Sequence, residues 1–137
     1  MNSRESDTYT LHRYFIWADR MRVHFQAVLF QGKENNPDYD VETFLYMSYW
    51  YGATYVVIEG WREARLNDPK VDELLESSNV ELLRKYRNGV FHYQKDYYSD
   101  KKFMPLIQEG RDVVSWIRSL SEAFSDYFLR WLEKRRT

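Results

Sequence analysis

Cysteine is absent from the 137-residue chain, and glycine and proline occur only five and three times. Without cysteine the chain has no disulfide, no thiolate metal site and no cysteine nucleophile, and this composition fits a reducing compartment. An all-β fold needs turn residues about every 8–12 positions, and this chain has too few of them. We therefore predict an all-α protein of the cytoplasm.

The first ten residues, MNSRESDTYT, contain no apolar segment, so we do not expect them to act as a signal peptide. The net charge is only −1, so no overall field attracts the protein to nucleic acid or to a membrane. The length suits one domain, which we place over residues 1–137.

Aromatic residues are abundant, with twelve Tyr, eight Phe and five Trp. They supply a large apolar area, and Tyr and Trp also tolerate half-wet interfaces. A small protein this rich in aromatic residues often has more apolar surface than one core can hide, so we predict that the chain forms a homodimer.

The spacing of apolar residues predicts an antiparallel bundle of four to five helices. Asp40 and Asp68 are the expected N-caps of the second and third helices, and Pro69 suits the first helical position. The last helix is expected to run from Pro105 through Gly110 to the basic C-terminal end. The other four are expected at about Thr10–Phe30, Val41–Leu66, Pro69–Glu76 and Val80–Tyr93.

The second of these helices is apolar on nearly every face. Its segment FLYMSYWYGATYVVIEGW carries Glu59 as its single charge, which would fit a membrane span by length. However, it is rich in Tyr, Ser, Thr and Gly, and no second span exists to pack with it. We therefore predict no membrane association and a central position in the bundle.

The three histidines limit the possible catalytic sites. His12 and His24 have no second histidine or carboxylate at the helical spacing that a metal site requires, so we predict no metal ion and no cofactor. His92 lies close to a basic cluster, in which Arg84, Asn88 and His92 are spaced four residues apart. Arg87 is five residues from His92, so the two converge only if Gly89 loosens the helix or a second copy of the chain contributes.

This cluster has the groups needed to cleave an RNA phosphodiester without a metal. A guanidinium binds phosphate through two parallel hydrogen bonds and stays charged. A histidine can take a proton from a ribose 2′-hydroxyl or give one to a leaving oxygen. Cationic groups also stabilise the charge that grows in the transition state.

The segment Arg87-Asn88-x-x-x-His92 resembles the Arg-x(4–6)-His signature of HEPN domains, in which a polar residue often follows the Arg. The resemblance rests on these few residues. It implies a small helical bundle that dimerises and brings two signatures into one cleft. It also implies a metal-independent endoribonuclease with a toxin or defence role. The implied partners are a second copy of the chain, RNA, and an antitoxin or nucleotidyltransferase.

On this hypothesis His92 is the general acid and base, Arg87 binds phosphate, and Asn88 orients either of these two side chains. Between Arg84 and Lys102 there are six basic and two acidic residues. The aromatic side chains interleaved with them are suited to stack on unpaired bases, and they are those of Tyr86, Phe91, Tyr93, Tyr97 and Tyr98. Glu59 is the candidate to orient Arg87. The candidate substrate-binding residues are Arg84, Lys85, Tyr93 and Lys95.

The alternative hypothesis is a non-catalytic helical interaction or regulatory protein. In that case the polar cluster is structural, either paired with the acidic segment 72–81 or with Arg87 held by Glu59. Exposure of Arg87 and His92 in one cleft would favour catalysis, whereas a buried ion pair and a covered histidine would favour the alternative.

Overall fold

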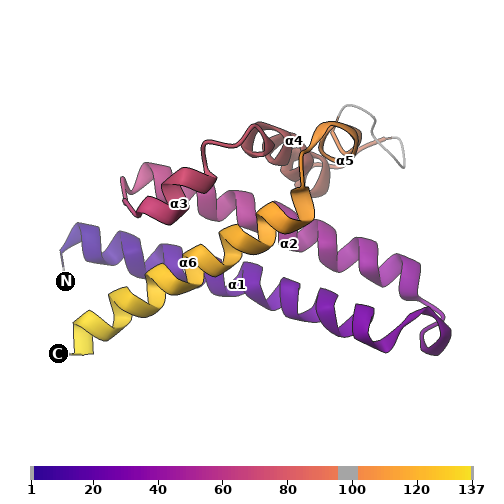
Figure 1. The fold of residues 1–137 in the computed structure, drawn as a ribbon, viewed down its shortest axis with the longest axis horizontal. Helices are drawn as coiled ribbons and strands as arrows, with labels where there is room; N and C mark the ends of the chain where they lie inside the picture. Colours follow the sequence, from indigo (N-terminus) through magenta and orange to yellow (C-terminus); the bar gives the residue numbers. More distant parts are fainter. Residues whose placement is uncertain (1, 96–101, 137) are drawn as a thin grey trace.

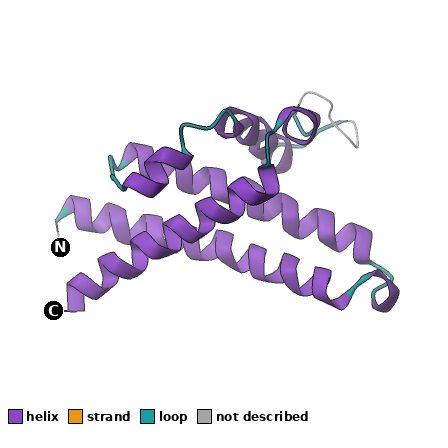
Figure 2. Ribbon diagram, in the orientation of Figure 1, coloured by secondary structure: helices purple, strands orange, loops and turns teal. Residues whose placement is uncertain are grey.

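The computed structural model describes residues 2–95 and 102–136. This part of the chain contains six α-helices and one short 3-10 helix, and no strand (Figure 2). The predicted all-α class is therefore confirmed. The elements are α1 (Ser3–Gln31), η1 (Lys33–Asn35), α2 (Tyr39–Glu63), α3 (Pro69–Leu74), α4 (Asn79–Phe91), α5 (Met104–Glu109) and α6 (Val113–Arg136).

The long helices α1 and α2 form an antiparallel hairpin that is joined by η1 (Figure 1). Helix α4 packs on α2, and the short α5 packs on α4. Helix α6 crosses the hairpin diagonally and contacts both α1 and α3. Both ends of the described chain lie at the end of the molecule remote from α4 and α5.

The core is built largely from aromatic rings. Phe15 of α1 stacks on Phe128 of α6, with their ring centroids 5.5 Å apart. Trp61 of α2 meets Phe124 of α6 edge to face at 5.6 Å. These side chains are almost fully buried. Their burial contributes to the hydrophobic stabilisation that holds α6 on the hairpin.

Helix α2 has the central position that its sequence predicts. Trp50, Tyr55, Ile58 and Trp61 are all buried against other helices of the same chain. None of the helices in the described ranges is long and apolar enough to cross a bilayer. The helix begins at Tyr39 with Asp38 at the N-cap position, so the prediction of Asp40 as the cap was wrong.

Helix α1 begins earlier than the sequence indicates, at Ser3 rather than near Thr10. The side chain of Asn2 caps it by accepting a hydrogen bond from the Glu5 amide at 2.8 Å. A second anchor is the ion pair between Glu5 and Arg135 of α6, at 2.7 Å. The first two turns are polar, so apolar spacing alone does not reveal them.

The single last helix predicted from Pro105 onward is wrong, because the chain breaks between Glu109 and Val113 to give α5 and α6. Gly110 is extended there, with φ −66° and ψ 139°, and Asp112 has a positive φ of 48°. The buried side chain of Asn79 holds this break, since it donates to the Arg111 carbonyl at 2.8 Å and accepts from the Arg111 amide at 3.1 Å.

The predicted cap of the third helix is confirmed. Asp68 accepts hydrogen bonds from the amides of Lys70 and Val71, both at 3.1 Å, and Pro69 occupies the first turn. Arg130 of α6 also donates to the Asp68 carboxylate at 2.8 Å, so the cap ties α3 to α6.

Candidate functional site

Arg87 is held in one direction by three groups near the end of α4. Its Nε donates to Asn88 Oδ1 at 2.9 Å, and its Nη1 donates to Glu59 Oε1 at 3.3 Å. The guanidinium carbon lies 4.8 Å from the centroid of the Tyr55 ring, a cation–π distance. Only 18% of the Arg87 side chain is exposed. The structure therefore brings together Arg87, Asn88 and Glu59, three of the residues singled out from the sequence.

His92 lies just beyond the helix. Helix α4 continues through Gly89 and ends at Phe91, and His92 is extended, with φ −118° and ψ 130°. Its amide donates to the Asn88 carbonyl at 3.1 Å, and its carbonyl accepts from Gln94 Nε2 at 2.7 Å. The residue is exposed. No hydrogen bond in the described part of the chain joins its ring to Arg87, so within one chain the two groups, five residues apart, are not paired.

Gly89 does not loosen α4. It is buried inside the helix, where an added Cβ would lie 2.8 Å from Lys102 Cβ and 2.9 Å from Phe103 Cζ. The glycine instead lets the chain that leads into α5 approach α4 closely. The change of direction occurs at His92.

Arg84 is taken up by a neighbour on its own helix. Its Nε is 3.0 Å from both carboxylate oxygens of Glu81, and its Nη2 is 2.6 Å from one of them. This bidentate hydrogen bond lowers the pKa of Glu81 and raises the pKa of Arg84. Arg84 is thus less available for phosphate than its sequence position suggests.

The remaining predicted binding residues differ in exposure. Lys85 is half-buried, Lys95 is exposed, and Tyr93 is 94% exposed. Tyr86, which the sequence also offered for stacking, is fully buried and hydrogen-bonded to Ser48 at 2.9 Å, so it cannot contact a base. Tyr97 and Tyr98 lie outside the described residues.

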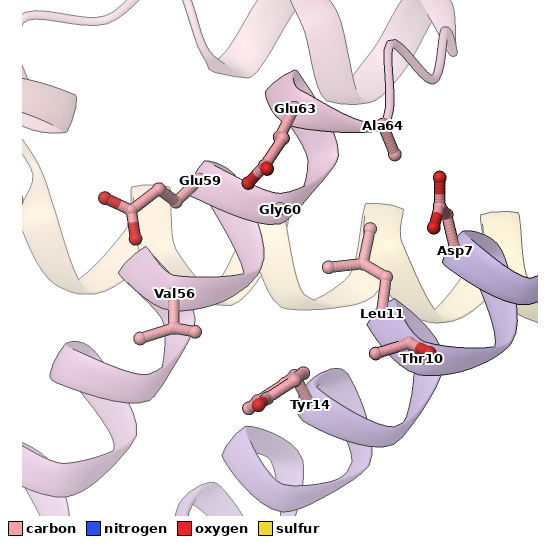
Figure 3. Close-up of a pocket in the computed structure, with 9 residues that line it drawn as sticks. All are labelled: Asp7, Thr10, Leu11, Tyr14, Val56, Glu59, Gly60, Glu63 and Ala64. Carbon is pink, nitrogen blue, oxygen red and sulfur yellow. The ribbon is translucent and has the colours of Figure 1, made fainter. Parts of the chain in front are cut away.

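A hollow of about 340 Å³ lies between α1 and α2 on one side of Arg87 (Figure 3). Its lining includes three carboxylates, those of Asp7, Glu59 and Glu63. Because Glu59 also binds Arg87, the guanidinium lies at the edge of an acidic region. Sequence reasoning missed this hollow, because Asp7 belongs to a different helix from the two glutamates.

An aromatic pair lies on the other side of Arg87 along α2. Phe91 is 5.7 Å from Tyr49 between ring centroids, and each residue is 43% exposed. Gly52 of α2 lies beneath the Phe91 ring, where an added Cβ would be 3.0 Å from Phe91 Cε2. Tyr49 was also missed, because nothing in the sequence links it to a residue forty-two positions later.

The other two histidines pack against rings. His12 lies 5.2 Å from Phe128, and burial lowers its pKa, whereas His24 stacks on Tyr46 at 5.2 Å. Among the described residues, no group of three or more metal-ligating side chains is arranged to hold an ion.

Comparison of the chain with protein-family models, with curated proteins and with solved structures finds no match. The relationship to HEPN domains therefore stays a prediction from the residues around Arg87.

Proposed function

We propose that this protein is a HEPN-like, metal-independent endoribonuclease that acts as a homodimer in a toxin or defence role in the cytoplasm. The observation that carries the proposal is the fixed guanidinium of Arg87, which Asn88, Glu59 and Tyr55 hold in place five residues before the exposed His92. A fixed cation and an exposed histidine are the groups that phosphodiester cleavage needs, and because Gly89 does not loosen α4, a second copy of the chain would have to bring them into one cleft.

The chemistry divides between these residues. His92 takes the proton of a ribose 2′-hydroxyl, whose oxygen attacks the adjacent phosphorus. The bond from phosphorus to the 5′-oxygen breaks, and that oxygen receives a proton, leaving a cyclic phosphate and a 5′-hydroxyl. Arg87 binds the phosphate oxygens and stabilises the charge that grows on them. Asn88 fixes the direction of the guanidinium.

A second copy of the chain would supply a second histidine, so that one ring accepts a proton while the other donates one. Apolar side chains that remain exposed on α1 and α2 support self-association. They include Ile16, Trp17, Val41 and Leu45.

The test is incubation of the wild-type protein and His92→Ala with total RNA in EDTA, read on a gel. His24→Ala is the matched control, because His24 is also an exposed histidine but lies on α1. We expect cleavage by the wild type and by His24→Ala, and none by His92→Ala. Equal cleavage by His92→Ala would rule out this mechanism.

The second candidate is the non-catalytic interaction or regulatory protein. The ion pair between Arg87 and Glu59 favours it, because a mostly buried guanidinium with a carboxylate partner has a structural use without RNA. In that case no RNA is cut, and Arg87→Ala lowers the melting temperature because it leaves Tyr55 and Glu59 without their partner. The cleavage assay of the wild type separates the two candidates, because Arg87→Ala loses the same contacts in either case.

A further inference from the structure

The surroundings of Arg87 differ in character along α2. Helices α2 and α4 are antiparallel, so Phe91 lies beside Tyr49 while Arg87 lies about two to three turns further along α2, beside Tyr55 and Glu59. Beyond Glu59 comes the acidic hollow (Figure 3). The guanidinium therefore separates an acidic surface from an aromatic one.

Tyr49 and Phe91 are in ring contact on the aromatic side, and Tyr93 follows Phe91 by two residues; we call these three residues the aromatic surface. The exposed fractions of these residues are 43%, 43% and 94%. Gly52 provides the room for the Phe91 ring to lie against α2, so that ring is supported from below while its outer part meets solvent. Such rings can each accept the flat face of another ring.

Charge decides the direction in which a bound polyanion extends. The three carboxylates of the acidic hollow repel phosphate, whereas the segment that follows Phe91 carries His92 and the exposed Lys95. A strand whose phosphate binds Arg87 therefore extends over the aromatic surface and away from the hollow.

We propose that the aromatic surface stacks the unpaired bases of single-stranded RNA next to the phosphate that Arg87 binds. This inference rests on the proposed function for the identity of the ligand. Stacking needs a base with a free face, and a paired base inside a duplex has both faces covered by its neighbours. The site therefore binds single-stranded RNA and discriminates against a duplex of the same sequence.

The test is binding, measured by fluorescence anisotropy in EDTA, of a labelled single-stranded RNA and of the same strand annealed to its complement. All proteins carry His92→Ala, so that no substrate is consumed. Tyr93→Ala and Phe91→Ala are added separately, with Phe30→Ala as the control. Phe30 is 95% exposed, as Tyr93 is, but lies on α1. Tyr93→Ala is the decisive variant, because a side chain so exposed contributes little to folding.

We expect Tyr93→Ala to weaken single-strand binding about tenfold, the loss typical of one stacked base. Phe30→Ala should leave binding unchanged, and the duplex should bind at least about tenfold more weakly than the single strand. Equal binding of Tyr93→Ala and its parent, or equal binding of single strand and duplex, overturns the proposal. A change of oligomeric state without a change of RNA affinity also overturns it, because the surface would then hold a second copy.

The cleavage assay keeps the two proposals apart. If Tyr93→Ala and Phe91→Ala cleave RNA as well as the wild type does, the nuclease proposal is supported and the role of the aromatic surface is contradicted. If single-stranded RNA binding depends on Tyr93 but the wild-type protein cleaves no RNA, the stacking role of the aromatic surface is supported and the nuclease proposal is contradicted.

Discussion

Glu59 and Arg87 form an ion pair of unequal burial, since the arginine side chain is 18% exposed and the glutamate side chain is 52% exposed, at 3.3 Å. The carboxylate is the wetter partner and also lines the acidic hollow. It therefore has two effects on the guanidinium, because it fixes its direction and offsets part of its charge.

Glu59→Gln should separate these effects. The amide oxygen can still accept the Arg87 hydrogen bond, while the negative charge is lost. We expect RNA to bind about threefold more tightly at low salt, because one repulsive charge near the phosphate is removed. Anisotropy titrations at low and high salt measure this gain, which should shrink as salt rises. Glu133→Gln removes one exposed negative charge near the end of α6 and is the control. Equal gains in the two variants would mean that the position of Glu59 is irrelevant.

The cap at Asp68 should make stability depend on pH. Burial raises the pKa of this carboxyl. Hydrogen bonds from Arg130 and from the amides of Val71 and Lys70 lower the pKa by more than burial raises it, so the net pKa lies below its ordinary value. A depressed pKa in the folded state contributes stability above the ordinary pKa, and this stability is lost as pH falls through the folded value.

We therefore expect Asp68→Asn to reduce the free energy of unfolding by about 1 kcal/mol at pH 7 and by much less near pH 3. Urea denaturation at both pH values measures the difference. Asp38→Asn is the control, because Asp38 also occupies an N-cap position but its side chain makes no capping hydrogen bond. A loss for Asp68→Asn that stays constant with pH would contradict the assignment.

Asn79 joins the start of α4 to the break before α6, and its removal should be costly. Asn79→Ala leaves the Arg111 amide and carbonyl without the partner that satisfies both. We expect a loss of about 2 kcal/mol in the free energy of unfolding. Thermal and urea melts measure it. Asn35→Ala, which removes one exposed hydrogen bond to the Gln31 carbonyl, should cost far less. Similar losses in the two variants would show that the break between α5 and α6 does not depend on the Asn79 side chain.

Gly89 of α4 and Gly52 of α2 should respond differently to substitution by alanine. At Gly89 the added Cβ meets Lys102 Cβ and the buried ring of Phe103, so α5 must shift. We expect Gly89→Ala to destabilise the protein by about 1–2 kcal/mol. At Gly52 the added Cβ meets the half-exposed ring of Phe91, which can turn toward solvent. Chemical denaturation of both variants tests this order, and a larger loss at Gly52 would reverse it.

The sequence predicts the helices where apolar spacing, capping residues and proline agree, as at Asp68 and Pro69. It fails at the α5–α6 break, because apolar residues keep a helical period across Gly110. The break depends on Asn79, thirty-two positions away, and no local pattern reports such a contact.

In the candidate site, too, the sequence predicts what is local and misses what depends on the packing of helices. Arg87, Asn88 and His92 stand out in the sequence because their chemistry is local. Whether Glu59 reaches Arg87 depends on how α2 and α4 pack, and the sequence left the alternatives open. Tyr49 and Asp7 were missed because each enters the site from another helix.

The closure of the core by α6 has a consequence for synthesis on the ribosome. Phe15 and Trp61 gain their partners Phe128 and Phe124 only after all the other helices have emerged. Arg135 then fastens to Glu5, 130 positions back along the chain. A nascent chain that has completed α1 and α2 therefore still presents two large aromatic side chains to solvent. Premature stops within α6 should yield aggregates or products for degradation rather than a smaller folded protein.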